Sequence, residues 1–272
     1  MSKTKKVKQD NIPLFVLGPP RSGTTILTQI LNSSEKIFLS DELRIVAWMS
    51  KEIDRINDGF NVHGDPYPFQ MGQRFALFMQ SNGSNFLLNF YKKISQELNK
   101  ENFIYWGDKY PHFDRYLHRI AQMFPRAKYI LIFRRIDEVL NSVMVGHKWS
   151  FKKSKDYCIK IYENYLDKID LIEHKNLFVF DYASFNKKER LDEIQKMFVF
   201  LNLQLSSTEI EALMERLNYQ SHSVRKSFKD KKNFDKNKSK FILKEKEVEN
   251  IKNDELISSI KANIKNKFSI DV

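Results

Sequence analysis

The sequence predicts an α/β fold of three layers, in which helices flank a central, mostly parallel sheet. Short apolar runs of strand length alternate along the 272-residue chain with longer stretches of helical periodicity. Apolar residues make up 42% of the composition, enough for a sizeable core, and no internal repeat interrupts the alternation. Alternating strands and helices are joined by right-handed crossovers, which make neighbouring strands parallel. Ligands of such sheets bind beyond the carboxyl ends of the strands.

The amino-terminal half is predicted to begin with a buried strand at 13–18, PLFVLG. A helix follows at 24–34, because its isoleucines and leucines recur with helical spacing. The apolar run at 36–42 predicts a second strand, and helical periodicity predicts a helix over 42–56. A strand-like run at 102–107 completes this half.

The alternation of strands and helices continues in the carboxyl-terminal half. The amphipathic pattern at 112–124 predicts a helix, and a proline comes just after it. KYILIFR at 128–134 is the clearest buried strand, and the helix at 137–147 begins with two acids, which the macrodipole favours. The remaining elements are a helix at 156–172, a strand at 176–181, helices near 188–201 and 206–216, and a terminal amphipathic helix at 245–266.

The chain is expected to comprise a basic amino-terminal tail, 1–12, and a single domain, 13–272. The lysine-rich stretch at about 229–241 has few large apolar residues and is expected to be mobile. Cys158 is the only cysteine, which excludes an internal disulfide and fits a reducing compartment. No apolar run is long enough for a signal peptide or a membrane span, so a soluble, cytoplasmic protein is expected.

The segment at about 59–102 is interpreted as an insertion that shapes the pocket of a second substrate. Its first part is expected to be irregular, because it is aromatic and broken by Gly, Asp and Pro. Tyr67 and Phe69 are candidates to line that pocket. Phe75 and Phe78 have helical spacing and are expected in the core.

The net charge of +12 favours either an anionic ligand or a lysine-rich surface. Most lysines lie among acids and asparagines, which is typical of a solvated surface, although the surplus would speed capture of an anionic substrate. A non-enzymatic nucleic-acid binder is one hypothesis. It is supported by charge alone, because no reader motif is present and the lysines do not alternate with aromatic residues.

GPPRSGTT, at 18–25, has the features of an anion-binding loop. It follows a strand and opens a helix, so the amides of Ser22, Gly23, Thr24 and Thr25 are expected to face a ligand. Arg21 adds a planar cation that suits phosphate or sulfate oxygens. The alternative is an ordinary strand-to-helix turn that a serine or threonine caps.

The loop departs from the phosphate loop of nucleoside triphosphatases, because Thr24 stands where their lysine would be. A nucleotide kinase or triphosphatase is therefore the second hypothesis. PPRSGTT instead resembles the 5′-phosphosulfate loop of sulfotransferases that use 3′-phosphoadenosine 5′-phosphosulfate (PAPS). This resemblance implies a P-loop-like fold, PAPS as donor and adenosine 3′,5′-bisphosphate (PAP) as product, with Arg21 at the reacting end of the donor.

A second pattern supports this resemblance. Arg134 ends the clearest strand, and Ser142 lies eight residues on, so the two can converge on one phosphate. The pair resembles the 3′-phosphate motif of the same family, although Ile136 replaces the usual proline. The alternative is pairing of Arg134 or Arg135 with the acids that follow, which is the better interpretation for Arg135.

The reacting groups are expected after two other strands. Glu42 and Arg44 resemble a Glu-x-Arg placement in tyrosylprotein sulfotransferases, which implies that Glu42 is the general base and that Arg44 orients it. GDKYP resembles a motif of the bacterial and tyrosylprotein-like branch, which implies that Lys109 stabilises the leaving group. The alternatives are a helix-start acid for Glu42 and a solvated lysine paired with Asp108 for Lys109. His112 is the rival base.

Other assignments are weaker. Arg225 and Lys226 are candidates for the 3′-phosphate, although the glycine that follows them in relatives is absent. Ile26 occupies the place of a tryptophan that contacts adenine in many relatives. No His/Cys/Asp cluster has ligand spacing, so no metal is expected. The acceptor hydroxyl could belong to a small molecule, a glycan or a peptide, and the oligomeric state is left open.

Overall fold

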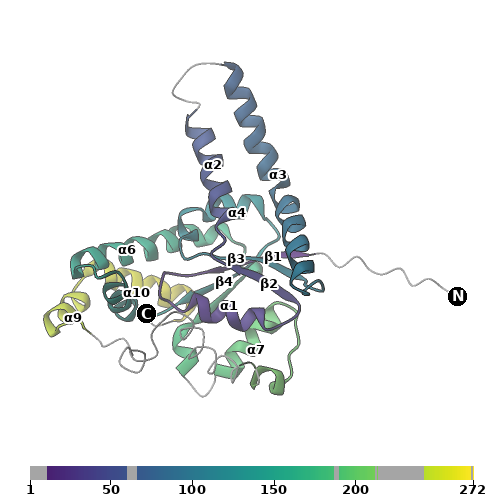
Figure 1. The fold of residues 1–272 in the computed structure, drawn as a ribbon. Helices are drawn as coiled ribbons and strands as arrows, with labels where there is room; N and C mark the ends of the chain where they lie inside the picture. The colour runs from purple at the N-terminus through teal and green to yellow at the C-terminus, as the bar shows by residue number, and fades with distance from the viewer. Residues whose placement is uncertain (1–10, 60–65, 187–189, 212, 214–241, 271) are drawn as a thin grey trace.

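A computed structural model describes residues 11–59, 66–186, 190–211, 213, 242–270 and 272 (Figure 1). Five parallel strands form one sheet in the order β2-β3-β1-β4-β5. Their bounds are β1 Ile12–Leu17, β2 Ile37–Asp41, β3 Tyr105–Lys109, β4 Lys128–Phe133 and β5 Leu177–Asp181. The predicted three-layer α/β fold is therefore confirmed.

Alternation along the strands builds a separate core on each face of the sheet. Successive side chains of a strand point to opposite faces. In β1, Leu14 and Val16 pack with the helices of one face, whereas Phe15 and Leu17 pack with those of the other. Both faces are covered, which explains why the strands read as continuous apolar runs rather than as alternating ones.

Helices of both layers pack against these cores. α1 (Thr24–Asn32) and α7 (Arg190–Phe200) cover the face of Leu14. The other face carries α4 (Leu117–Met123), α5 (Ile136–His147), α6 (Phe151–Lys168), α9 (Glu245–Lys252) and α10 (Glu255–Phe268). Short 3₁₀ turns lie at η1 (Phe113–Arg115), η2 (Ile169–Leu171), η3 (His174–Asn176) and η4 (Tyr182–Asn186).

A helical hairpin projects from the face of the sheet that carries Phe15 (Figure 1). It consists of α2 (Ile45–Gly59) and α3 (Pro66–Glu97), and its base packs into the core. The expectation of an irregular segment is thus wrong from Pro66 onward. Pro66 and Pro68 lie in the first turn of α3, where proline is tolerated. Phe78 is 58% exposed, so its predicted place in the core is also wrong.

Several predicted boundaries differ from the observed ones. The helix predicted at 112–124 is split by the non-helical Tyr116, and the terminal helix is split where Asp254 caps α10 through the Ile257 amide. Strand β3 is shifted towards the carboxyl terminus, so Lys109 is its last residue. None of the helices in the described ranges combines the length and apolarity needed to cross a bilayer.

Candidate active site

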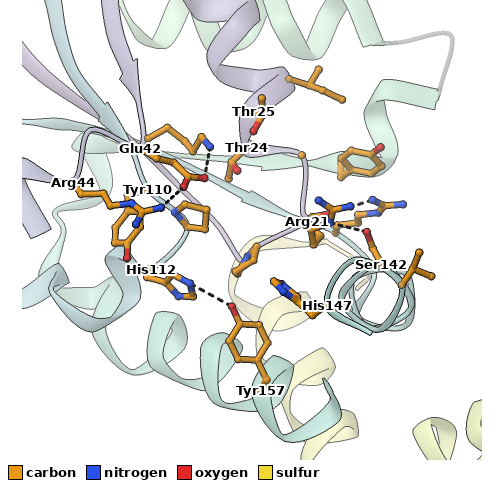
Figure 2. A pocket seen from close by; sticks show the side chains of 18 of the residues that line it. Arg21, Thr24, Thr25, Glu42, Arg44, Tyr110, His112, Ser142, His147 and Tyr157 are labelled. Atoms are coloured by element: carbon orange, nitrogen blue, oxygen red, sulfur yellow. Dashed lines mark hydrogen bonds and ion pairs between the residues drawn. The ribbon is translucent and has the colours of Figure 1, made fainter. Parts of the chain in front are cut away.

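A cavity of about 1080 Å³ lies at the carboxyl ends of the strands (Figure 2). Each of the five strands contributes to it, either through its last residue or through the segment that follows. The predicted residues that line it are Arg21, Gly23, Thr24, Thr25, Glu42, Arg44, Lys109, His112, Arg134 and Ser142. Parallel strands share one carboxyl edge, which is why residues so far apart in the sequence meet.

The loop at 18–25 forms one wall of the cavity. The first amides of a helix have no acceptor within it, so Thr24 and Thr25 offer backbone donors at the positive end of α1. Ser22 departs from the prediction, because its amide donates to the Pro19 carbonyl over 3.1 Å. The Ser22 side chain is buried, and its hydroxyl has no hydrogen-bond partner among the described residues.

Two structural features require glycine at position 23. Its φ of 103° lies in the left-handed region, where a Cβ is strained. A Cβ would also lie 2.6 Å from ring carbons of Tyr182, which follows β5 and lines the cavity. The loop can therefore approach Tyr182 this closely only without a side chain.

Arg134 and Ser142, the residues predicted to bind the 3′-phosphate, do not contact each other directly. Arg21 Nε donates to Ser142 Oγ over 3.0 Å, and Arg134 Nη1 donates to the Arg21 carbonyl over 3.1 Å (Figure 2). Ser142 and Arg134 thus both contact Arg21, and Arg134 Nε lies 2.7 Å from a carboxylate oxygen of Glu138. The Arg134 guanidinium also lies 4.3 Å from the centre of the Tyr182 ring.

These contacts test the surface alternatives. Arg134 pairs with Glu138, as one alternative allowed, yet it still lines the cavity. Arg135 pairs with Asp137 over 2.8 Å and is exposed, as predicted for it. Two arginines, 21 and 134, therefore meet at one wall of the cavity, and such an arrangement favours an anionic ligand between them.

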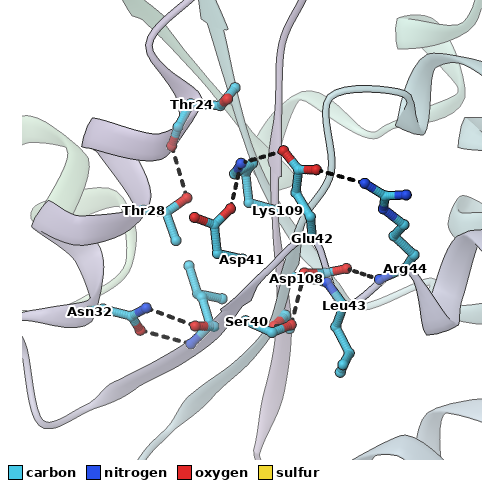
Figure 3. A network of polar contacts seen from close by, with 12 residues as sticks. Thr24, Thr28, Asn32, Ser40, Asp41, Glu42, Leu43, Arg44, Asp108 and Lys109 are labelled. Carbon is cyan, nitrogen blue, oxygen red and sulfur yellow. Dashed lines mark hydrogen bonds and ion pairs between the residues drawn. The ribbon is translucent and has the colours of Figure 1, made fainter. Parts of the chain in front are cut away.

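An ion-pair network occupies the opposite part of the site (Figure 3). Lys109 Nζ lies 3.0 Å from Glu42 Oε1 and 2.5 Å from Asp41 Oδ1, and its side chain is only 2% exposed. The other oxygen of Glu42 accepts from Arg44 over 3.1 Å. The alternative of a solvated lysine paired with Asp108 is therefore wrong, because Lys109 is buried and pairs with Asp41, which ends β2, and with Glu42, which follows it.

Charge keeps Glu42 ionised. Partial burial by itself would raise its pKa, but the neighbouring Lys109 ammonium and Arg44 guanidinium outweigh burial and hold the pKa below the usual 4.5. The carboxylate is consequently negative at neutral pH and can accept a proton, although its intrinsic basicity is reduced.

The turn that carries Glu42 is held by Asp108. Glu42 and Arg44 both have positive φ, 62° and 64°, which is strained for residues with side chains. Asp108 is 1% exposed and accepts hydrogen bonds from the amides of Leu43 and Arg44 and from Ser40 Oγ (Figure 3). Burial raises the pKa of Asp108 to about 6, and these hydrogen bonds limit the rise.

The base of the hairpin contacts the two strands, β2 and β3, next to this turn. Tyr91 of α3 donates to the Gly107 carbonyl over 2.5 Å, and its hydroxyl lies 2.6 Å from Ser40 Oγ. Neither Asp108 nor Tyr91 was predicted to serve the site. The only signal for Asp108 in the sequence was an acid next to the lysine of the strand. The contact of Tyr91 with Gly107 could not be predicted, because 16 positions separate the two residues.

A sequence model of the Sulfotransferase family matches residues 13–207. The chain belongs to the sulfotransferase family. The predicted resemblance is therefore confirmed at the level of the family.

Solved sulfotransferases share the fold over almost the whole chain. The sulfotransferase domain from the curacin biosynthetic pathway has a TM-score of 0.56 at 15% identity, covering 97% of this chain and 99% of that one. The sulfotransferase from Alicyclobacillus acidocaldarius has a TM-score of 0.54 at 13% identity, covering 98% of each chain. Mouse sulfotransferase SULT7A1, solved in complex with PAP, has a TM-score of 0.54 at 14% identity, covering 96% of this chain and 85% of that one.

A relative by sequence is an uncharacterized protein of Aquifex aeolicus (strain VF5), 30% identical over 122 residues. The match covers 45% of this chain but only 15% of that much longer protein.

Rings form a further wall of the sulfotransferase cavity. His112 Nε2 lies 3.4 Å from the hydroxyl of Tyr157, and the His112 ring stands edge-on to the ring of Tyr110. Burial, with a smaller contribution from Arg115, lowers the pKa of His112, so its imidazole is neutral at neutral pH. Of these rings, only His112 was among the predicted site residues.

Some predicted sulfotransferase residues cannot be placed. Arg225 and Lys226 lie outside the described residues, as do the amino-terminal tail up to residue 10 and the stretch 229–241. Tyr67 and Phe69 fall in α3, but their side chains are outside the described part. Within the described residues, no three His, Cys, Asp or Glu side chains are grouped to hold a metal ion.

Proposed function

We propose that this sulfotransferase moves the sulfuryl group of PAPS to a hydroxyl of an acceptor and releases PAP. The observation that carries the proposal is the shared cavity, where an anion-binding loop, two arginines and a carboxylate–lysine pair line one space. The mouse relative of similar fold was solved with PAP, which supports this donor class.

The residues present fit such a donor. The amides of Thr24 and Thr25, with Arg21, would hold the phosphosulfate end, because they present donors and positive charge at the start of α1. Arg134 and Ser142 would hold the 3′-phosphate. The Arg21–Ser142 hydrogen bond would then be exchanged for bonds to the ligand, since both groups can donate to phosphate oxygens.

The transfer needs a base and a group that stabilises the leaving phosphate. As the bond between sulfur and the 5′-phosphate oxygen breaks, the acceptor oxygen bonds to sulfur and its proton passes to Glu42. Lys109 would neutralise the charge that appears on the departing phosphate, and its burial strengthens that interaction. His112, neutral and in the same cavity, is the second candidate base.

We also propose that 13–272 is one domain. The family match ends at 207, but Ile257 and Ile264 of α10 pack in the same core as Phe133 of β4.

Calorimetry tests the donor. Tight binding of PAP without magnesium is expected. Binding that prefers ATP with magnesium and ignores the 3′-phosphate would overturn the proposal in favour of a nucleotide kinase or triphosphatase. Salt-sensitive binding of oligonucleotides, with neither nucleotide bound, would favour a nucleic-acid binder. Supplying PAPS with a cell extract and seeking a mass gain of one sulfuryl group would then identify the acceptor.

A further inference from the structure

Two tyrosines of α6 contact the segments that line the cavity without lining it themselves. Tyr162 and Tyr165 are both 0% exposed. The Tyr162 hydroxyl donates to the Arg134 carbonyl over 2.5 Å. The Tyr165 hydroxyl accepts from the Gly18 amide over 3.1 Å and lies 3.3 Å from the Pro111 carbonyl.

These hydrogen bonds reach the ends of three strands. Gly18 follows β1, Pro111 lies two residues after β3, and Arg134 follows β4. Two residues that are three apart lie on the same side of one helix, so α6 fixes the separation of their contacts. Burial raises the pKa of both tyrosines well above the usual value, so the hydroxyls stay protonated. Because both side chains are fully buried, water does not reach these hydrogen bonds in the folded protein.

We propose that Tyr162 and Tyr165 are positioning residues that, through α6, set the distance between the loop at 18–25 and Arg134 to suit the two phosphate groups of PAP. The inference rests on the proposed function. It assigns Tyr165 to the 5′ side of the ligand and Tyr162 to the 3′ side. A merely structural role would instead stabilise the fold without affecting one phosphate group more than the other.

The test replaces each hydroxyl by hydrogen and measures the affinities for PAP and for adenosine 5′-monophosphate by calorimetry. Tyr162→Phe is expected to weaken the binding of PAP about tenfold, the equivalent of one net hydrogen bond, and to leave the affinity for the monophosphate unchanged. Tyr165→Phe is expected to weaken both ligands. Tyr105→Phe is the matched control, because this buried hydroxyl donates to Leu201 over 2.6 Å and serves no segment of the cavity.

Thermal unfolding of each variant separates positioning from stability. The inference is overturned if Tyr162→Phe and Tyr165→Phe lower the melting temperature, as the control does, yet bind both ligands like the unaltered protein. Equal losses of both ligands in Tyr162→Phe would remove its assignment to the 3′ side. Should Tyr165→Phe not fold, the ligand selectivity of Tyr162→Phe still decides. Failure of the unaltered protein to bind PAP would refute the proposed function instead.

Discussion

At the scale of single residues, Glu42 is held between two cations and is therefore oriented before any substrate arrives. One oxygen lies beside Lys109 and the other beside Arg44. The lowered pKa makes the carboxylate a weak base in the resting protein. This suffices in the proposed reaction, because the acceptor hydroxyl becomes more acidic as it bonds to sulfur.

Removal of this charge tests the base. Glu42→Gln keeps the shape of the side chain but cannot take a proton, so turnover should fall by about a hundredfold or more. PAP affinity should remain, since Glu42 is not among the proposed phosphate ligands. Glu52→Gln, on α2 and paired with Arg55, is the control for loss of one carboxylate. Unchanged turnover would move the role of base to His112.

Arg134 offers a test of the 3′ side. Arg134→Ala removes a guanidinium from the cavity and should weaken PAP by about ten- to a hundredfold, the range of a hydrogen bond to a charged group. Adenosine 5′-monophosphate should bind almost as before, and calorimetry with both ligands measures the difference. The neighbouring Arg135→Ala, which removes an exposed arginine paired with Asp137, should change neither affinity. Equal losses for both ligands would exclude Arg134 from this role.

The residues that line the cavity could be predicted from the sequence better than the partners of their side chains. Arg21, Glu42, Lys109 and Arg134 all lie in the cavity, because each lies at or just after the carboxyl end of a parallel strand. Side-chain partners depend on distances between segments far apart in the chain. For this reason the hydrogen bond of Ser142 to Arg21, across 121 positions, was not foreseen.

At the scale of elements, three of the non-glycine residues with positive φ lie in the two turns that carry the charged groups. Arg21, Glu42 and Arg44 have φ of 71°, 62° and 64°. Such conformations persist where surrounding contacts impose them. In the second turn the contacts are the hydrogen bonds of Asp108, so the rest of the fold offsets the strain.

The glycine at the start of α1 allows a direct test of the first turn. Gly23→Ala combines a left-handed backbone with a Cβ 2.6 Å from Tyr182, so the free energy of unfolding should fall by about 1–2 kcal/mol or more. PAP affinity should fall as well, because the loop must move. Denaturant unfolding and calorimetry measure the two effects.

Gly83→Ala is the matched control within α3. Its Cβ would lie 2.8 Å from the flexible end of Met49 and in ordinary contact, at 3.8 Å, with Met123 Sδ. Glycine within a helix is about 0.5–1 kcal/mol less stable than alanine. Little or no loss of stability is therefore expected. If Gly23→Ala behaved like this control, the loop would not require glycine.

The elements themselves were predicted unevenly. All five strands were predicted near their observed places, because their apolar runs are short and continuous. The long helix α3 was missed in its first part, since Gly, Asn and Pro within and before it resemble loop composition. Leu77 and Phe78 of this helix are also exposed, at 64% and 58%, so its apolar residues do not all follow a buried face.

At the scale of the whole molecule, activity and stability should respond differently to pH. Asp108 holds its proton more tightly in the folded protein, with a pKa of about 6 against 3.8, so its contribution to stability increases as pH falls through this range. Protonation nevertheless occupies an oxygen that the Leu43 or Arg44 amide requires. Turnover should therefore decline below about pH 6 while the fold persists.

Turnover and thermal unfolding, measured in parallel from pH 8 to 5, check this expectation. The lowered pKa of Glu42 puts loss of its charge, and of the stability that its ion pairs supply, at more acidic pH, below 4.5. Asp108→Asn should be less active throughout and should lose the decline near pH 6. Full turnover of the unaltered protein at pH 5 would contradict the role given to Asp108.

The contact of Tyr91 has a mechanical consequence. Tyr91 belongs to α3, whose far end stands clear of the sheet, and its hydroxyl touches Ser40 and Gly107, the immediate neighbours of Asp41 and Asp108. A load applied at the Pro66 end of this 32-residue helix would act over most of its length before it reached those bonds. A small tilt of the hairpin would consequently shift Ser40 and Gly107, and with them the neighbouring Asp41 and Asp108, far from the point where the force is applied.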